Sequence, residues 1–182
     1  MSTASNQSSY NLLSKLLHWI VVLLLTSQFI LIWISQFGYR LKDKVLGMNM
    51  IDNHKALGLA VLAVAVIRLL WRWIGGLPDW AQGLAAWEKK TAHTLEVWLY
   101  RFLFFIPATG ILYSLTSGYP IHFFNLFSIP KIMSYNLILA NATWFIHMFS
   151  AYALVAVVAL HIGFVVRRTV FEKDRYIRRM LW

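Results

Sequence analysis

The chain has 182 residues, of which 59% are hydrophobic and only 13% are charged, and its mean hydropathy is +0.60. Soluble domains carry about 25% charged residues, so this composition excludes a water-soluble protein and predicts an integral membrane protein. The 17 basic and 7 acidic residues leave a formal net charge of +10, which by itself would also suit a nucleic-acid-binding protein.

Four stretches are apolar enough to cross a bilayer, which takes about 20 residues of helix. They are residues 16–37, 57–74, 95–117 and 144–166. Residues 1–14 are polar and are predicted to form a disordered tail, and residues 15–182 are predicted to form a single domain. We expect the first span to be retained, because no small-residue cleavage site follows a short apolar core. The predicted fold class is an all-α, integral membrane four-helix bundle.

The connections between the spans contain clear breakers. A basic external loop is predicted at residues 38–53, and a Gly-Gly-Leu-Pro segment at residues 75–78 ends the second span. Pro107 and Gly110 are expected to bend the third span, an irregularity that neighbouring helices can accommodate. The long external loop at residues 118–141 is expected to contain a short interfacial helix.

The basic residues separate by membrane side. Four spans place both termini on one side, and if that side is cytoplasmic it carries twelve basic residues against five outside. The five outer residues are Arg40, Lys42, Lys44, Lys55 and Lys131. This asymmetry obeys the positive-inside rule, so we predict cytoplasmic termini in a bacterial inner membrane. Arg178 and Arg179 are then expected to contact anionic lipid headgroups, and no nucleic-acid partner is expected.

The sequence contains no cysteine. That absence excludes disulfides, thiolate metal sites, iron–sulfur clusters and the covalent attachment of c-type haem. Any redox cofactor must therefore be held by other side chains.

Histidines occur at matched depths of the predicted bundle. His18 lies at the inner end of the first span and His54 at the outer end of the second, while the last span carries His147 near its outer end and His161 near its inner end. The 14 residues between His147 and His161 make about 3.9 turns and ~21 Å of helix, so both project from nearly the same face. The pattern predicts two stacked sites, His18/His161 and His54/His147.

Two axial imidazoles and no open position favour haem that transfers electrons over oxygen chemistry at iron. Each histidine alone could instead be a hydrogen-bonded polar group, but polar residues inside a membrane are costly and usually functional. Zinc or non-haem iron would recruit carboxylates or cysteines, and only Glu96 lies within a span. Gly58, one turn after His54, leaves room for a flat macrocycle or merely permits close helix packing.

The sequence resembles the bacterial cytochrome b561 family, relatives of the b-type subunits that anchor nickel hydrogenases and formate dehydrogenases. The resemblance covers nearly the whole chain after residue 12. It is carried by Leu17-His18-Trp19, His54-Lys55-Ala56-Leu57-Gly58, Arg68-Leu69-Leu70-Trp71-Arg72, His147, His161, Phe171-Glu172-Lys173-Asp174 and Arg178-Arg179-Met180-Leu181.

The resemblance implies two haem b groups with His18, His54, His147 and His161 as axial ligands, and quinone, expected to be ubiquinone, as a substrate. Arg68 and Arg72 are candidate partners of the haem propionates, although cytoplasmic anchoring explains both equally well. Some small stand-alone members oxidise superoxide at the outer face and pass the electron to quinone, which makes a superoxide:ubiquinone oxidoreductase our specific prediction.

Positive charge is expected near the outer haem. Arg40, Lys42, Lys44 and Lys55 could steer an anion such as superoxide toward it. The alternative is that they are ordinary interfacial residues.

On the quinone side, the sequence departs from the family pattern at two positions. Many relatives have histidine where this chain has Arg168 and Glu96. Arg168 could donate to a quinone oxygen and Glu96 could deliver protons, with His93 as a further candidate. The alternatives are headgroup contact for Arg168 and pairing of Glu96 with Lys89 or Lys90.

Two other functions stay open. The chain could be an anchor subunit that relays electrons between a peripheral dehydrogenase or hydrogenase and quinone, or a structural or transport bundle without haem. Co-purification with a cluster-bearing partner would indicate the first, and absence of a haem spectrum the second.

Overall fold

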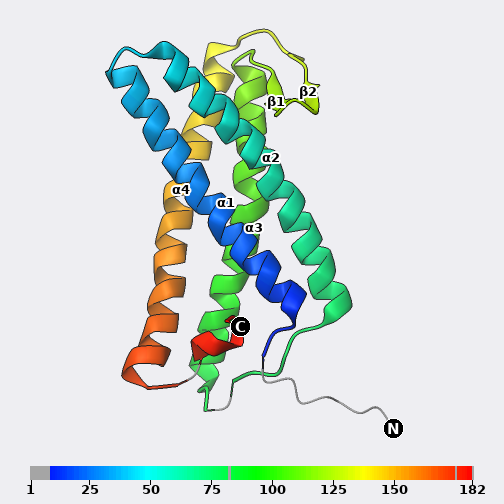
Figure 1. Ribbon diagram of the computed structural model, residues 1–182, viewed down its shortest axis with the longest axis vertical. Coiled ribbons are helices and arrows are strands. Elements are labelled where there is room, and N and C mark those ends of the chain that lie inside the picture. Colours follow the sequence, from blue (N-terminus) through cyan, green and yellow to red (C-terminus); the bar gives the residue numbers. More distant parts are fainter. Residues whose placement is uncertain (1–8, 82, 175, 182) are drawn as a thin grey trace.

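The computed structural model describes residues 9–81, 83–174 and 176–181. It contains four long helices, α1 (Leu12–Arg40), α2 (Lys44–Gly75), α3 (Ala86–Thr116) and α4 (Leu137–Val166) (Figure 1). The strands β1 (Ile121–Phe123) and β2 (Phe127–Ile129) lie between α3 and α4, and the π-helical turn η1 (Arg167–Phe171) and the 3-10 turn η2 (Tyr176–Arg179) follow α4. All four helices are long and apolar enough to cross a membrane, which confirms the predicted all-α four-helix membrane fold.

Polar side chains mark where the helices begin. Asn11, Asp43 and Asn136 each accept a hydrogen bond from the backbone N–H three residues later, at 2.9–3.0 Å. At the start of α3 the Glu88 carboxylate instead reaches back to accept from the backbone N–H of Ala85 at 2.9 Å. These bonds satisfy N–H groups that have no partner within the helix.

The predicted loop at residues 38–53 is too long, so its predicted boundaries are wrong. The connection between α1 and α2 is only residues 41–43, and residues 44–53 are helical. The two helices stay paired beyond the apolar segments because Ser35, 1% exposed, donates to the backbone carbonyl of Gly47 at 2.9 Å. The hydropathy pattern indicates only the part of a helix that lies in lipid. This contact between α1 and α2 stabilises helix beyond that part.

The predicted interfacial helix within residues 118–141 is also wrong. The segment forms an antiparallel hairpin in which Ile121 pairs with Ile129 and Phe123 with Phe127. Burial alternates along β1, where Ile121 is 2% exposed and His122 is exposed. Alternation of this kind is typical of a strand with one buried face, and β1 packs on α2.

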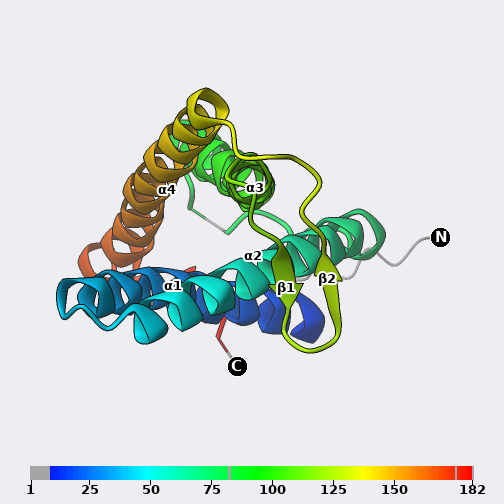
Figure 2. The same cartoon turned by 90° about the horizontal axis from the view of Figure 1, so that it is seen from above.

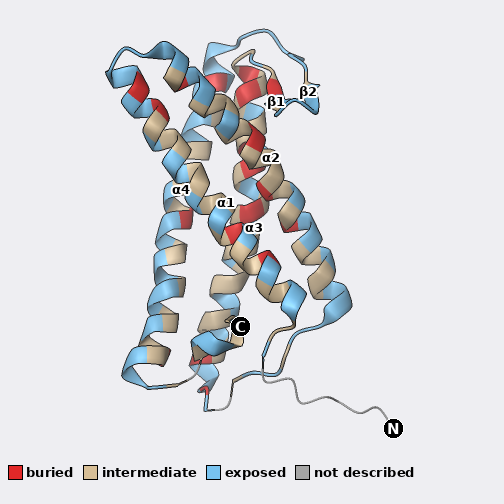
Figure 3. Cartoon of the chain, viewed as in Figure 1, coloured by how far each residue is buried: buried red, intermediate tan, exposed pale blue. Residues whose placement is uncertain are grey.

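The helices form two pairs. Seen from above, α1 lies beside α2 and α3 lies beside α4, and α2 also packs against α3 (Figure 2). A small core of Val21, Val61, Ala65 and Leu103 lies where α1, α2 and α3 meet. Buried residues are few, and much of the outer helix surface is exposed (Figure 3), as expected for a surface that contacts lipid.

The described ends of the chain meet at one end of the bundle (Figure 1). Residues 12–14, predicted to belong to the tail, form the first turn of α1, while residues 1–8 of that tail lie outside the described residues. Lys15 and Trp19 donate to the backbone carbonyls of Leu181 and Met180 at 2.6 and 3.0 Å. We call this the tail end of the bundle, and the opposite end, which carries β1 and β2, the hairpin end.

Candidate functional site

The structure brings four histidines together in the predicted pairs. His18 of α1 faces His161 of α4 at the tail end, with 6.4 Å between ring centroids. His54 of α2 faces His147 of α4 at the hairpin end, with 6.2 Å between centroids. We call these the tail-end pair and the hairpin-end pair. One helix, α4, therefore contributes to both.

Both centroid distances suit two imidazoles that hold one metal ion between them. A metal–imidazole bond is about 2 Å long, and the ring centre lies about 1 Å further on, so the two centroids should be roughly 6 Å apart. Across the described part of the chain, no group of three or more His, Cys, Asp or Glu side chains could hold a metal. Each pair thus fits a metal whose other ligands come from a macrocycle, as in haem, better than zinc or non-haem iron.

Backbone carbonyls orient the hairpin-end pair. The Nδ1 atom of His54 lies 3.3 Å from the carbonyl oxygen of Gln28, and Nδ1 of His147 lies 3.0 Å from that of Ile106. A carbonyl can only accept, so each Nδ1 donates its proton and leaves the Nε2 lone pair free for a metal. Gln28 also donates from its side-chain amide to the backbone carbonyl of His54 at 3.1 Å.

A cation lies beside the tail-end pair. The Arg68 guanidinium is 3.4 Å from Nδ1 of His18 and donates to the hydroxyl of Tyr100 at 3.1 Å. When Nε2 of a histidine binds a metal, Nδ1 carries the ring proton. Arg68 places positive charge beside His18 but cannot accept a hydrogen bond from that Nδ1 proton. Of the two arginines predicted to contact the cofactor, Arg68 therefore adjoins a histidine directly.

Arg72, the other predicted cofactor contact, pairs with Glu96 of α3. The expected alternative partners of Glu96, Lys89 and Lys90, are thus wrong. The tertiary contact between α2 and α3 brings Arg72 closer than the lysines of Glu96's own helix.

The Arg72–Glu96 pair lies in a small cavity of about 30 Å³ at the tail end. The cavity is lined by Tyr10, Ser14, Arg68, Trp71, Arg72, Gly76, Leu77, Glu96, Tyr100 and Met180. Burial raises the pKa of the Tyr10 phenol above its usual value, so this hydroxyl stays protonated and can donate. His93 is exposed and is not among the lining residues.

Arg168 is not among the residues that line the small cavity. Its side chain is 7% exposed and binds three carboxylates, those of Glu88, Glu172 and Asp174, with nitrogen–oxygen distances of 3.3 Å to Glu88 and 2.5 Å to Glu172. These contacts tie η1 to the start of α3. Carboxylates therefore already surround the Arg168 guanidinium, which favours a structural role for this residue, while headgroup contact and donation to quinone stay predictions.

The candidate steering residues divide into two kinds. Arg40, Lys42 and Lys44 are exposed around the short α1–α2 connection. Lys55 is instead engaged with the Asp52 carboxylate at 3.2 Å and the Pro120 carbonyl at 3.5 Å. Its charge is largely offset, and its contacts attach the segment before β1 to α2.

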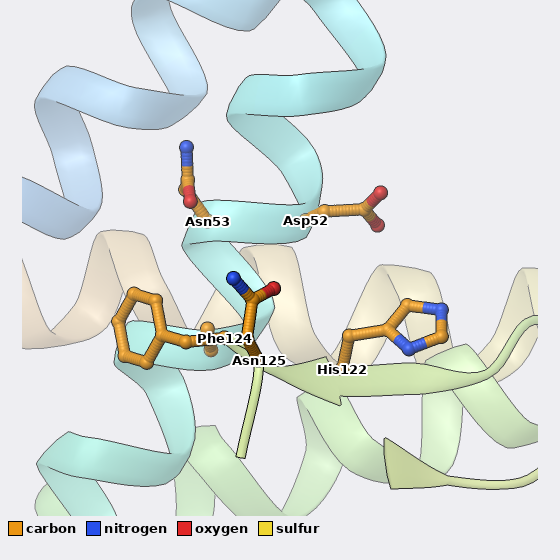
Figure 4. Close-up of a pocket in the computed structure, with 6 residues that line it drawn as sticks. Asp52, Asn53, His122, Phe124 and Asn125 are labelled. Atoms are coloured by element: carbon orange, nitrogen blue, oxygen red, sulfur yellow. The ribbon is translucent and has the colours of Figure 1, made fainter. Parts of the chain in front are cut away.

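A larger cavity of about 340 Å³ lies between α2 and the hairpin, lined by Asp52, Asn53, Ala56, His122, Phe124 and Asn125. In the close-up, Asp52 and His122 point to the same side (Figure 4). At 100° per helical residue, Asp52 and Ala56 project about 200° away from His54. The cavity is therefore on the opposite face of α2 from the hairpin-end pair.

Gly58 is not required for packing between α1 and α2. A Cβ atom there would meet only the side-chain amide of Gln28, at an ordinary 3.7 Å. The glycine that presses on a histidine is Gly110, where a Cβ atom would come within 3.0 Å of the His147 ring. From the sequence, Gly110 is expected only to bend the third span, and its contact with His147, like the contacts of Gln28 and Tyr100, is not predicted.

Comparison with known proteins agrees with this geometry. The family model of prokaryotic cytochrome b561 matches residues 9–182. Cytochrome b561 homolog 2 of Escherichia coli (strain K12) is 25% identical over 182 residues, which cover 100% of this chain and 95% of that protein. The chain therefore belongs to the prokaryotic cytochrome b561 family, whose members transfer electrons in membranes with b-type haem.

Proposed function

We propose that this chain carries electrons across the bacterial inner membrane, from a donor at the outer face to quinone at the inner face, through two b-type haems. The observation that carries the proposal is the presence of two facing histidine pairs, 6.2 and 6.4 Å between ring centroids, at opposite ends of one bundle. Haem b bound by each pair would supply one-electron iron chemistry without an open coordination position.

The proposed orientation places the hairpin end outside and the tail end in the cytoplasm. The distribution of basic residues supports it, because the tail end carries the larger share. His54 and His147 then hold the outer haem, and His18 and His161 hold the inner haem.

At the inner face, quinone reduction takes two electrons and two protons to give quinol. Glu96 and Tyr10 line the small cavity beside Arg68. The Glu96 carboxylate can accept a proton from the cytoplasm and pass it to the quinone, and the protonated Tyr10 can donate a hydrogen bond to a quinone oxygen. Arg72 holds the Glu96 carboxylate in place. Ubiquinone is the expected quinone.

At the outer face, superoxide is the donor that we propose. Two superoxide ions would each lose one electron to form two molecules of dioxygen, and the two electrons would reduce one quinone. The exposed Arg40, Lys42 and Lys44 support this choice, since their net positive field attracts an anion.

The test is stopped-flow mixing of the purified, quinone-loaded protein with superoxide while the haem absorption bands are followed. The proposal predicts fast haem reduction and then quinol. Haem that is stable to superoxide but reduced by a co-purifying dehydrogenase would identify an anchor subunit instead. A colourless protein would exclude both.

Variants of single histidines test the number of haems. His18→Ala and His147→Ala should each lose one of two haems, measured as haem per protein. His122→Ala is the matched control, because His122 is exposed and bonds to Ser128 within the hairpin, and it should keep both.

A further inference from the structure

Helix α3 carries neither histidine of the hairpin-end pair, yet three of its residues within five positions lie against the His147 ring. The Ile106 carbonyl lies 3.0 Å from Nδ1, and the Thr109 hydroxyl lies 3.2 Å from the same atom. A Cβ atom on Gly110 would come within 3.0 Å of Cε1 and 3.3 Å of Nδ1. We call Ile106, Thr109 and Gly110 the His147 seat.

The local sequence of α3 makes this seat possible. Pro107 has no N–H and removes one bond from the helical ladder, and Gly110 has no side chain, so the backbone of this turn can approach a neighbouring ring closely. Thr109, 6% exposed, donates to the Ile106 carbonyl at 2.8 Å. Its hydroxyl is therefore held in place next to Nδ1 rather than free to rotate.

The tail-end pair has no equivalent seat. A Cβ atom on Gly163, two residues after His161, would meet nothing within 4 Å. Within the described residues, the ring nitrogens of His161 have no hydrogen bond, and the neighbour of His18 is the Arg68 cation rather than a carbonyl. The two sites therefore differ in what orients their ligands.

We propose that Thr109 and Gly110 are positioning residues for the outer haem, acting through His147. The carbonyl and hydroxyl hold the ring proton on Nδ1 so that Nε2 faces the metal, and Gly110 sets how deeply the ring lies against α3. This inference rests on the proposed binding of two haems. Outer-sphere partners of metal-binding histidines usually change metal affinity or activity about 10–100-fold when removed.

The first test compares Gly110→Ala with Gly163→Ala in the purified protein with both haems bound. The added methyl at 110 must displace the His147 ring by a few tenths of an ångström, whereas the methyl at 163 has open space. We expect Gly110→Ala to move one of the two low-spin ferric haem signals in the electron paramagnetic resonance spectrum, and Gly163→Ala to leave both unchanged.

The second test uses Thr109→Val, which keeps the volume and removes the hydroxyl, with Thr109→Ser as the conservative variant that restores it. Transfer of haem to excess apomyoglobin should become about tenfold faster for one haem in Thr109→Val and return toward the wild-type rate in Thr109→Ser.

The haem content of the wild-type protein tests the two-haem proposal, and the spectra and transfer rates of the variants test the His147 seat. A wild-type protein with fewer than two haems would overturn the two-haem proposal itself. A wild-type protein with two haems whose spectra and transfer rates are unchanged in both Gly110→Ala and Thr109→Val would overturn the seat and leave the proposed function standing. Equal changes at both haems would also contradict it, because the seat contacts only His147.

Discussion

Replacing Arg68 by methionine should lower the reduction potential of one haem and leave the other unchanged. The guanidinium lies 3.4 Å from Nδ1 of His18, and among its described contacts there is no carboxylate that would offset its charge. A positive charge stabilises reduced iron relative to oxidised iron. Its removal should therefore make the inner haem harder to reduce.

The magnitude follows from the distance. The imidazole and a metal–nitrogen bond add about 4 Å to that contact, which places the charge roughly 7 Å from the iron. At an effective dielectric constant of about 20, two unit charges at that distance interact by about 2.4 kcal/mol. With about 59 mV per tenfold change for one electron, this corresponds to about 100 mV. Arg68 is half-buried, so solvent screening reduces the expected shift to about 50–100 mV.

The assay is a redox titration of the haem absorption bands in wild-type protein and Arg68→Met. Arg101→Met is the control, because Arg101 is exposed and stacks on Trp98, with its guanidinium carbon 4.9 Å from the ring centroid. It should shift neither potential by more than about 20 mV. An unchanged or raised inner potential in Arg68→Met, or a shift at the outer haem, would refute the electrostatic reasoning.

Three further predictions concern quinone, superoxide and stability. Glu96→Gln should slow quinone reduction at least about 100-fold, because it removes a carboxylate that relays protons, while the first phase of haem reduction stays at its wild-type rate. Stopped-flow absorbance separates the two phases, and an equal slowing of both would exclude the proton role. Raising the ionic strength from about 10 mM to about 150 mM should reduce the rate with superoxide about tenfold. The double variant Lys42→Gln/Lys44→Gln should have a weaker salt dependence, whereas Lys55→Gln should change it little because Asp52 already offsets the charge of Lys55. An identical salt dependence in the wild-type protein, the double variant and Lys55→Gln would argue against steering. Asn136→Ala removes the cap of α4 and should cost about 1 kcal/mol, a fall of about 2–4 °C in the thermal transition, and Asn136→Asp should retain the wild-type transition if the cap is the cause.

The helical hairpins also show what hydropathy cannot predict. The apolar segments indicate four spans correctly, yet α2 begins ten residues before His54, at Lys44. Those residues are too polar to be recognised as part of a span. They are helical because Asp43 caps their first turn and Ser35 of α1 donates to the carbonyl of Gly47. Similarly, the hairpin of β1 and β2 depends on packing of Ile121 against α2, a contact between residues distant in sequence.

The sequence by itself determined the membrane class, the four spans and the depth-matched pairing of His18 with His161 and His54 with His147, because hydropathy and helical rise depend only on local spacing. Only the tertiary structure decided which groups surround those rings. It placed the Ile106 carbonyl and Gly110 against His147, Arg68 against His18, and Arg168 among three carboxylates. Apart from Glu172 and Asp174, which follow Arg168 closely in the chain, these partners come from different helices, and their proximity follows from how the helices pack.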